Sequence, residues 1–239
     1  HGSGTVTLNA DAGTVTLAAA VSSTTGAVAV TGDVIAQNAG GNISTTGAGT
    51  ITVTADTGAI TMADGTSSST ADGTISYSAA TDVALSLLTS SAAAAINVTA
   101  DSDANGSGAI TDNTAGEAAN LITTGTATLI AAQGIGAAAA ADIDTTIGTL
   151  VATNSTTGAI FIQETSGLII GGTGVRTLAG DGNINIDVDA GALTVNSVVT
   201  AHGSGTVTLN AAAGTVTLAA AVSSPTGAVA VTGDVIAQN

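Results

Sequence analysis

The sequence predicts an all-β fold, a parallel β-helix (β-solenoid) of triangular cross-section with about 22 residues per coil. Three observations predict it. Apolar β-branched residues alternate with Thr or Asn, and this period of two is typical of strands. A short strand–turn–strand unit recurs along the chain. Apolar residues make up 44% of the 239 residues but aromatic residues only 1%, so the core consists of small aliphatic side chains that suit thin, regular layers.

The recurring unit is clearest at residues 4–17, GTVTLNADAGTVTL. It returns as GTITVTADTGAITM at 49–62, as GNINIDVDAGALTV at 182–195 and almost unchanged as GTVTLNAAAGTVTL at 205–218. Each copy has a short alternating strand, a turn that ends in Gly and a second short strand. A third apolar side closes some coils, at Val21, Ile43 and Val198. Three short sides predict the triangular coil.

A longer repeat contains these units. Residues 1–38 and 202–239 match at 36 of 38 positions, so 1–201 forms one full repeat of a continuous solenoid and 202–239 starts the next copy. The glycines at Gly4, Gly26, Gly49 and Gly73 mark successive coils, and we expect Gly182 to continue the series. About nine coils then fit each 201-residue repeat and extend a rod by roughly 43 Å. We expect further copies on either side of this segment.

Stacking determines which residues pack together. We expect Val6, Val28 and Ile51 to lie one above another, with each coil sealed only by its neighbours. Two Ala-rich runs, 92–95 and 137–141, fit either a helical turn or a tight corner of small residues.

The charge excludes several kinds of partner. The formal net charge is −16, from 17 acidic residues against one base, Arg176. Such a chain repels nucleic acid and anionic lipid. No run of 18 apolar residues predicts membrane insertion, no signal peptide is visible, and without Cys no disulfide can form.

Strings such as GNINIDVDAGALTVNS (182–197) and GTVTLNADAGTVTLAA (4–19) resemble the filamentous haemagglutinin-like adhesins and related giant β-strand-repeat surface proteins of bacteria. The resemblance implies a right-handed β-helix, secretion to the cell surface and an elongated fibre. It implies self-association as the main contact, with surface glycans as candidate partners, and no universal active-site residues. We expect a structural segment of an extracellular fibre or adhesin stalk. The absence of Lys and the near absence of aromatic residues depart from that family and favour the repetitive structural fibre over host adhesion.

Acidic residues supply the candidate metal ligands. Five of them are expected to stack along one corner: Asp11, Asp33, Asp56, Asp101 and Asp189. Carboxylates about 4.8 Å apart repel by roughly 0.9 kcal/mol even in water, and Ca²⁺ would relieve that repulsion. The alternative is that each Asp begins a turn before Gly and points into solvent.

A second calcium candidate is the run Asp101, Asp103, Asn105, Gly106 and Asp112, which has oxygen ligands at loop positions 1, 3, 5 and 12 and Gly at position 6. Position 12 is Asp rather than the bidentate Glu, and no helices flank the loop. A polar loop inserted between coils is the alternative interpretation.

Other functions fit less well. Outward pairs such as Thr5/Thr7 and Thr50/Thr52 resemble ice-binding TxT arrays, but Ala27/Ala29 interrupts them. Tandem immunoglobulin-like sandwiches would predict a period near 100 residues and a buried aromatic residue. A calcium-stiffened surface binding module is the third alternative.

We expect no enzyme. His1 and His202 are equivalent turn positions in two copies of the repeat, and Glu117 and Glu164 stand isolated in the sequence. Arg176 is expected in a loop. Acid–base catalysis needs clustered side chains, and the sequence predicts none.

Overall fold

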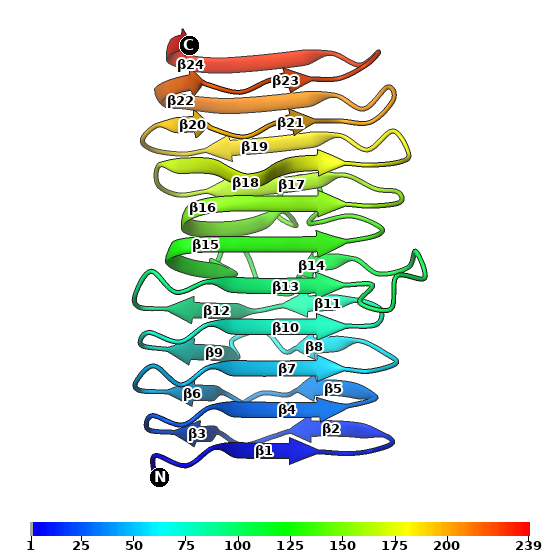
Figure 1. Ribbon diagram of the computed structural model, residues 1–239, viewed down its shortest axis with the longest axis vertical. Helices are drawn as coiled ribbons and strands as arrows, with labels where there is room; N and C mark the ends of the chain where they lie inside the picture. Colours follow the sequence, from blue (N-terminus) through cyan, green and yellow to red (C-terminus); the bar gives the residue numbers. More distant parts are fainter. Residues whose placement is uncertain (1) are drawn as a thin grey trace.

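The computed structural model describes residues 2–239, so His1, one of the two equivalent histidines, lies outside them. The described chain is all-β and contains no helix, and hence no helix able to cross a membrane. Parallel strands stack into one rod with the two termini at opposite ends (Figure 1). In Figure 1 the strands in front run from left to right and the chain returns behind them as it rises, which is a right-handed winding. The predicted parallel β-helix is confirmed, and tandem immunoglobulin-like sandwiches are excluded.

Three parallel faces make up the N-terminal half, as a triangular coil requires. The first face contains β1 (Val6–Asn9), β4 (Val28–Gly32), β7 (Ile51–Ala55), β10 (Ile75–Ala79) and β13 (Ile96–Ala100). The second face contains β2 (Thr14–Leu17), β5 (Val34–Gln37), β8 (Ile60–Met62), β11 (Val83–Leu85) and β14 (Ile110–Asp112). The third face contains β3 (Val21–Ser23), β6 (Ile43–Thr45), β9 (Ser67–Thr70) and β12 (Leu87–Ser90).

The C-terminal half continues the same winding with longer strands, several of which turn from one face onto the next. The long strands are β15 (Leu121–Ala131), β16 (Ile143–Asn154), β18 (Leu168–Thr177), β22 (Val207–Leu218) and β24 (Val229–Gln238). The short ones are β17 (Ile160–Glu164), β19 (Ile184–Val188), β20 (Leu193–Val195), β21 (Val199–Thr200) and β23 (Val222–Ser223). Arg176 therefore lies on strand β18, not in the loop we predicted.

Vertical columns of aliphatic side chains form the core. Val6 pairs with Val28 and Val28 with Ile51, so the predicted stacking is confirmed. The first four coils lie 22 to 24 residues apart. Val28 and Ile51 have no exposed surface, because coils above and below cover them. The predicted third side is also present at Val21 and Ile43, whereas Val198 is exposed and its neighbour Val199 is buried instead.

Hydroxyl side chains and glycines form the corner between the third and first faces. The Ser23 hydroxyl lies 2.8 Å from the carbonyl oxygen of Gly4, to which it donates, and accepts a hydrogen bond from the Gly26 amide at 3.1 Å. Thr70 accepts in the same way from Gly73 at 2.8 Å. A side chain on the corner glycine would collide with the backbone of the coil before it. The glycine spacing in the sequence therefore reflects close approach of backbones.

The two copies of the long repeat are wound in different phases. Val207, the equivalent of Val6, pairs with Ile184 and lies in the second-face column that begins at Val15, not in the column of Val6. That column is Val15, Ile35, Ile60, Val83, Ile110, Ile135, Ile160, Ile184 and Val207.

The 201 residues between Val6 and Val207 therefore take eight coils and one further face, slightly fewer than the nine coils expected. The prediction that Gly182 continues the Gly4 series was wrong for the same reason. A side chain on Gly182 would meet Gly158, at another corner of the coil.

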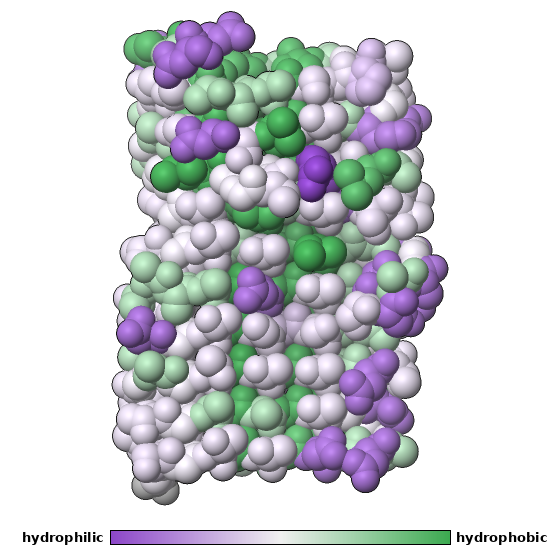
Figure 2. All heavy atoms as spheres, viewed as in Figure 1, coloured by the Kyte–Doolittle hydropathy of each residue, from purple (hydrophilic) through white to green (hydrophobic). Residues whose placement is uncertain are grey.

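Neither Ala-rich run is helical. Both 92–95 and 137–141 are turns between strands, so the alternative of small-residue corners is the one observed. Figure 2 shows hydrophilic side chains gathered along the edge where the first-face strands end, beside a front face of mostly intermediate hydropathy.

Candidate metal centre

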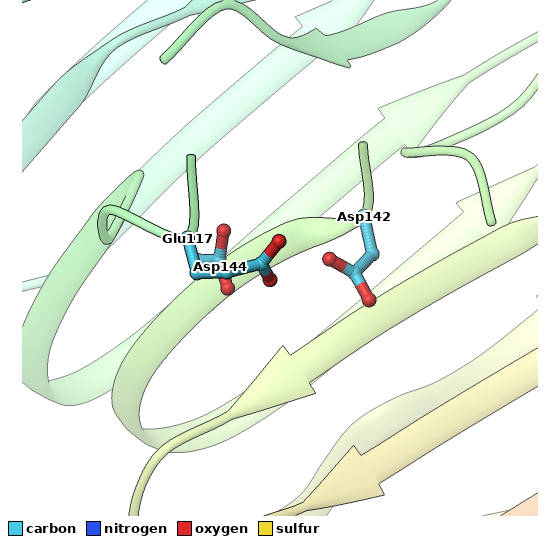
Figure 3. A group of neighbouring side chains, drawn as sticks. All are labelled: Glu117, Asp142 and Asp144. Atoms are coloured by element: carbon cyan, nitrogen blue, oxygen red, sulfur yellow. The ribbon is translucent and has the colours of Figure 1, made fainter. Parts of the chain in front are cut away.

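The coil between β13 and β15 carries two insertions. Residues 101–109 project from the rod, and residues 113–119 leave the end of β14 before the chain enters β15. One coil further along the rod, Asp142 and Asp144 stand at the start of β16. Figure 3 shows Glu117, from the second insertion, with its carboxylate directed at those of Asp142 and Asp144.

These three acids are close enough to share one ion. One carboxylate oxygen from each lies within 4.8 Å of the others. Glu117 is exposed, Asp142 is half-buried and Asp144 is only 8% exposed. Within the described chain no other three acidic or histidine side chains meet in this way.

Backbone geometry explains how Asp144 is held. Strand alternation turns Ile143 into the core and Asp144 to the outer side, where the insertion covers it. The Asp144 amide donates to Asn120 Oδ1 at 2.9 Å, and the Asn120 amide donates to the Asp144 carbonyl at 2.8 Å. Asn120 Nδ2 also donates to Asp112 Oδ1 at 2.7 Å. Asn120 thus ties β14 to β16 and fixes the position of Asp144.

The carboxylate of Asp144 receives no hydrogen bond from any described residue, and the buried Oδ1 of Asp142 has no partner either. Burial, followed by the charges of Asp142 and Glu117, raises the pKa of Asp144 to about 7. Burial and then the charge of Glu117 also raise the pKa of Asp142. Carboxylate oxygens are the ligands that hard cations such as Ca²⁺ and Mg²⁺ prefer. The arrangement can therefore hold either extra protons or a cation.

The predicted Asp column is present in part. Strand register places Asp11 beside Asp33 and Asp33 beside Asp56, but Ala80 interrupts the column before Asp101. Asp33 Oδ2 accepts a hydrogen bond from the Gly13 amide at 2.7 Å, which links adjacent coils. Asp11 accepts one from Asn9 at 2.6 Å. These bonds match the alternative interpretation, in which Asp begins a turn, and metal binding by the column stays a prediction.

Asp189 was wrongly placed in that column. It follows Val188, which pairs with Glu164, and Glu164 pairs with Thr145 at the start of the third face. Asp189 therefore lies at a different corner from Asp11, for the same reason that the second copy is out of phase with the first.

The predicted calcium loop at 101–112 forms a turn closed by its own hydrogen bonds. Asp101 Oδ1 accepts from the Gly106 amide at 2.9 Å, and Asp103 Oδ2 accepts from Asn105 Nδ2 at 2.7 Å. Asp112 lies on β14 and accepts from Thr114 and Asn120. Its carboxylate does not form a group with Asp101 and Asp103 in the described structure. Calcium binding by this loop stays a prediction.

Two acids that seemed isolated in the sequence have different environments. Glu117 belongs to the acidic cluster, which the sequence analysis missed. Glu164 is fully buried, and its carboxylate accepts from Thr145 Oγ1 and the Ile147 amide, at 2.7 and 3.0 Å, and from Ser166. A usable signal for the cluster was the alternating pair Asp142 and Asp144, with another acid about one coil earlier at Glu117.

The comparisons with known proteins give no relative. No protein-family model, no curated protein sequence and no solved structure matches this chain.

Proposed function

We propose that this chain is a structural segment of an extracellular fibre or adhesin stalk built from tandem β-solenoid repeats. Its main contacts are with further coils of the same kind, as in the haemagglutinin-like surface proteins that its strand repeats resemble. The proposal rests on the fold, the repetition of the sequence and the way in which each coil is covered.

One observation carries the proposal. Identical residues are buried in the second coil and exposed in the last one. Val28 and Ile35 have no exposed surface, while their equivalents Val229 and Ile236 are 44% and 51% exposed. The side chains are the same and only the covering coil differs. A further coil would bury this apolar surface, with a gain of about 25 cal/mol for each Å² removed from water.

The rest of the surface suits a fibre. A net charge of −16 keeps separate rods apart and soluble. The edge β24, by contrast, carries unpaired backbone groups, which are a template for another strand. Growth along the axis is therefore favoured over lateral contact.

The test is to lengthen the chain by one 201-residue repeat, by adding a second copy of residues 39–239 after Asn239. We expect a straight rod that is longer by about 40 Å in electron micrographs, with an axial diffraction spacing of about 4.8 Å. A compact particle of unchanged length would contradict the proposal. For the location, an antibody against this chain should label intact cells of the source organism, and labelling only after lysis would contradict it.

A further inference from the structure

We propose that Glu117, Asp142 and Asp144 bind one divalent cation, Ca²⁺, which fastens the insertion at 113–119 to the coil that begins at β16. This site is separate from both calcium sites suggested by the sequence. It does not depend on whether the chain forms a fibre.

The main observation is the environment of Asp144. Its side chain is more than nine-tenths buried, points into the cluster and receives no hydrogen bond from any described residue. Buried polar groups in proteins are almost always paired. Glu164 illustrates the usual solution, since each of its carboxylate oxygens accepts hydrogen bonds from hydroxyl and amide donors. The groups that the Asp144 carboxylate meets in this cluster are two further carboxylates, and one cation would serve as a partner for all three.

Asp142 adds an independent indication. Its Oδ1 atom is shielded from solvent and has no hydrogen-bond partner. The unpaired oxygens thus come from the two residues on either side of Ile143, the first residue of β16, and both carboxylates are directed at Glu117. The only base in the chain, Arg176, is on β18 and forms no part of this group.

Calcium suits this group better than magnesium. Ca²⁺ takes six to eight oxygen ligands at about 2.3–2.6 Å in flexible geometry, whereas Mg²⁺ needs near-ideal octahedral geometry at about 2.0–2.1 Å and gives up its water reluctantly. One oxygen from each carboxylate lies within 4.8 Å of the others, which is within the span of oxygens that one Ca²⁺ can bridge. Water would complete the coordination on the side that Glu117 leaves exposed.

Titration with CaCl₂, MgCl₂ and TbCl₃ at 150 mM NaCl tests the site in the full chain. We expect one Ca²⁺ per chain, at least tenfold weaker binding of Mg²⁺, and Tb³⁺ luminescence that Ca²⁺ abolishes. Asp144→Asn and Glu117→Gln should each weaken calcium binding at least tenfold. Asp103→Asn, in the 101–109 insertion, is the matched control and should bind like the unmodified chain.

Protease protection gives a second measurement. The chain has only two Glu residues, the exposed Glu117 and the buried Glu164. A Glu-specific protease should therefore cut after Glu117, and bound Ca²⁺ should slow that cut at least tenfold. Circular dichroism confirms that each variant is folded, and Glu117→Gln, at an exposed position, serves if Asp144→Asn does not fold.

Two results would overturn the proposal. One is calcium binding that is unchanged in both Asp144→Asn and Glu117→Gln. The other is calcium binding that is lost in Asp103→Asn but kept in these two variants, which would assign the ion to the loop at 101–112.

Discussion

At the scale of single residues, Asp144 differs from the other acids in this chain. Several acids, such as Asp33 and Asp181, accept a hydrogen bond from a backbone amide of an adjacent coil and so link two coils at a turn. For Asp181 the bond from Ser204 lowers the pKa of the carboxyl. Asp144 has no such donor, and its pKa moves the other way, to about 7. Asp33 and Asp181 therefore stabilise corners through their hydrogen bonds, whereas the carboxylate of Asp144 is repelled by those of Asp142 and Glu117.

This difference predicts an unusual pH dependence. In EDTA, protonated Asp144 is favoured in the folded chain, because its pKa there, about 7, exceeds the ordinary value of 3.8. Its contribution to stability is therefore fully present below about pH 4 and is lost as the pH rises through about 7. The acids that contribute to the shift are Asp142, Glu117, Asp112 and Asp189.

We expect the melting temperature without metal to fall between pH 5 and pH 8, and to fall less in Asp144→Asn. Differential scanning calorimetry measures both. Saturating Ca²⁺ should remove the fall, because a cation competes with the protons for the same oxygens. Identical pH profiles for the variant and the unmodified chain would show that Asp144 is not the titrating group.

At the scale of elements, the corner of the coil is the feature that repeats most faithfully. Ser23 and its equivalent Ser224 make the same contacts, to Gly4 and Gly26 in one copy and to Gly205 and Gly227 in the other. They do so although the two corners lie between different pairs of faces. The serine and its two glycines therefore specify the geometry of the corner, but they do not specify which face of the rod follows it.

The corner glycines give a direct prediction. A Cβ on Gly49 would collide with the backbone of Gly26, so Gly49→Ala should destabilise the chain by about 1–3 kcal/mol through overpacking. The matched control is Gly4→Ala, because nothing lies within 4 Å of the Cβ position there. The midpoint of urea unfolding, followed by circular dichroism, should drop for Gly49→Ala and hardly change for Gly4→Ala. Equal midpoints would mean that the coils can move apart at this corner.

The sequence predicts the strands and the aliphatic columns well because both depend on local alternation. Val6 and Val28 follow the period of two and stack as expected. The phase of the second copy could not be predicted this way. It depends on the total length of the insertions and long strands between residues 101 and 182, where no local pattern marks the face.

The acidic cluster was missed for a related reason. Glu117 lies on an insertion, and its approach to Asp144 depends on how that insertion folds over the next coil. Spacing alone favoured Asp101 and Asp112, which resemble a calcium loop in the sequence but are engaged in different hydrogen bonds. Pattern matching finds ligands that are close in sequence, whereas this site joins a loop to the start of a strand.

At the scale of the whole molecule, the phase difference determines the surface of a longer rod. Each 201-residue repeat adds eight coils and one face, so equivalent residues move to the next face in the next copy. A feature that lies on one side of the first copy therefore points about 120° away in the second. Three copies take 25 coils, about 120 Å, and return the surface to its first orientation.

Gold labels test this rotation. Thr7 is exposed on β1, and its equivalent Thr208 is partly exposed on β22, in the second-face register. In a chain lengthened to three copies, labels on cysteines at every Thr7-equivalent position should follow a three-fold spiral in cryo-micrographs. A Thr7→Cys, Ala29→Cys pair is the control, because these two residues are direct partners and their labels should lie one above the other. Labels in a straight line from copy to copy would mean that the repeat winds through a whole number of coils. In the straight arrangement, a long rod would carry one continuous stripe of identical side chains on one side. In the spiral arrangement, the same surface would appear on each side of the rod in turn.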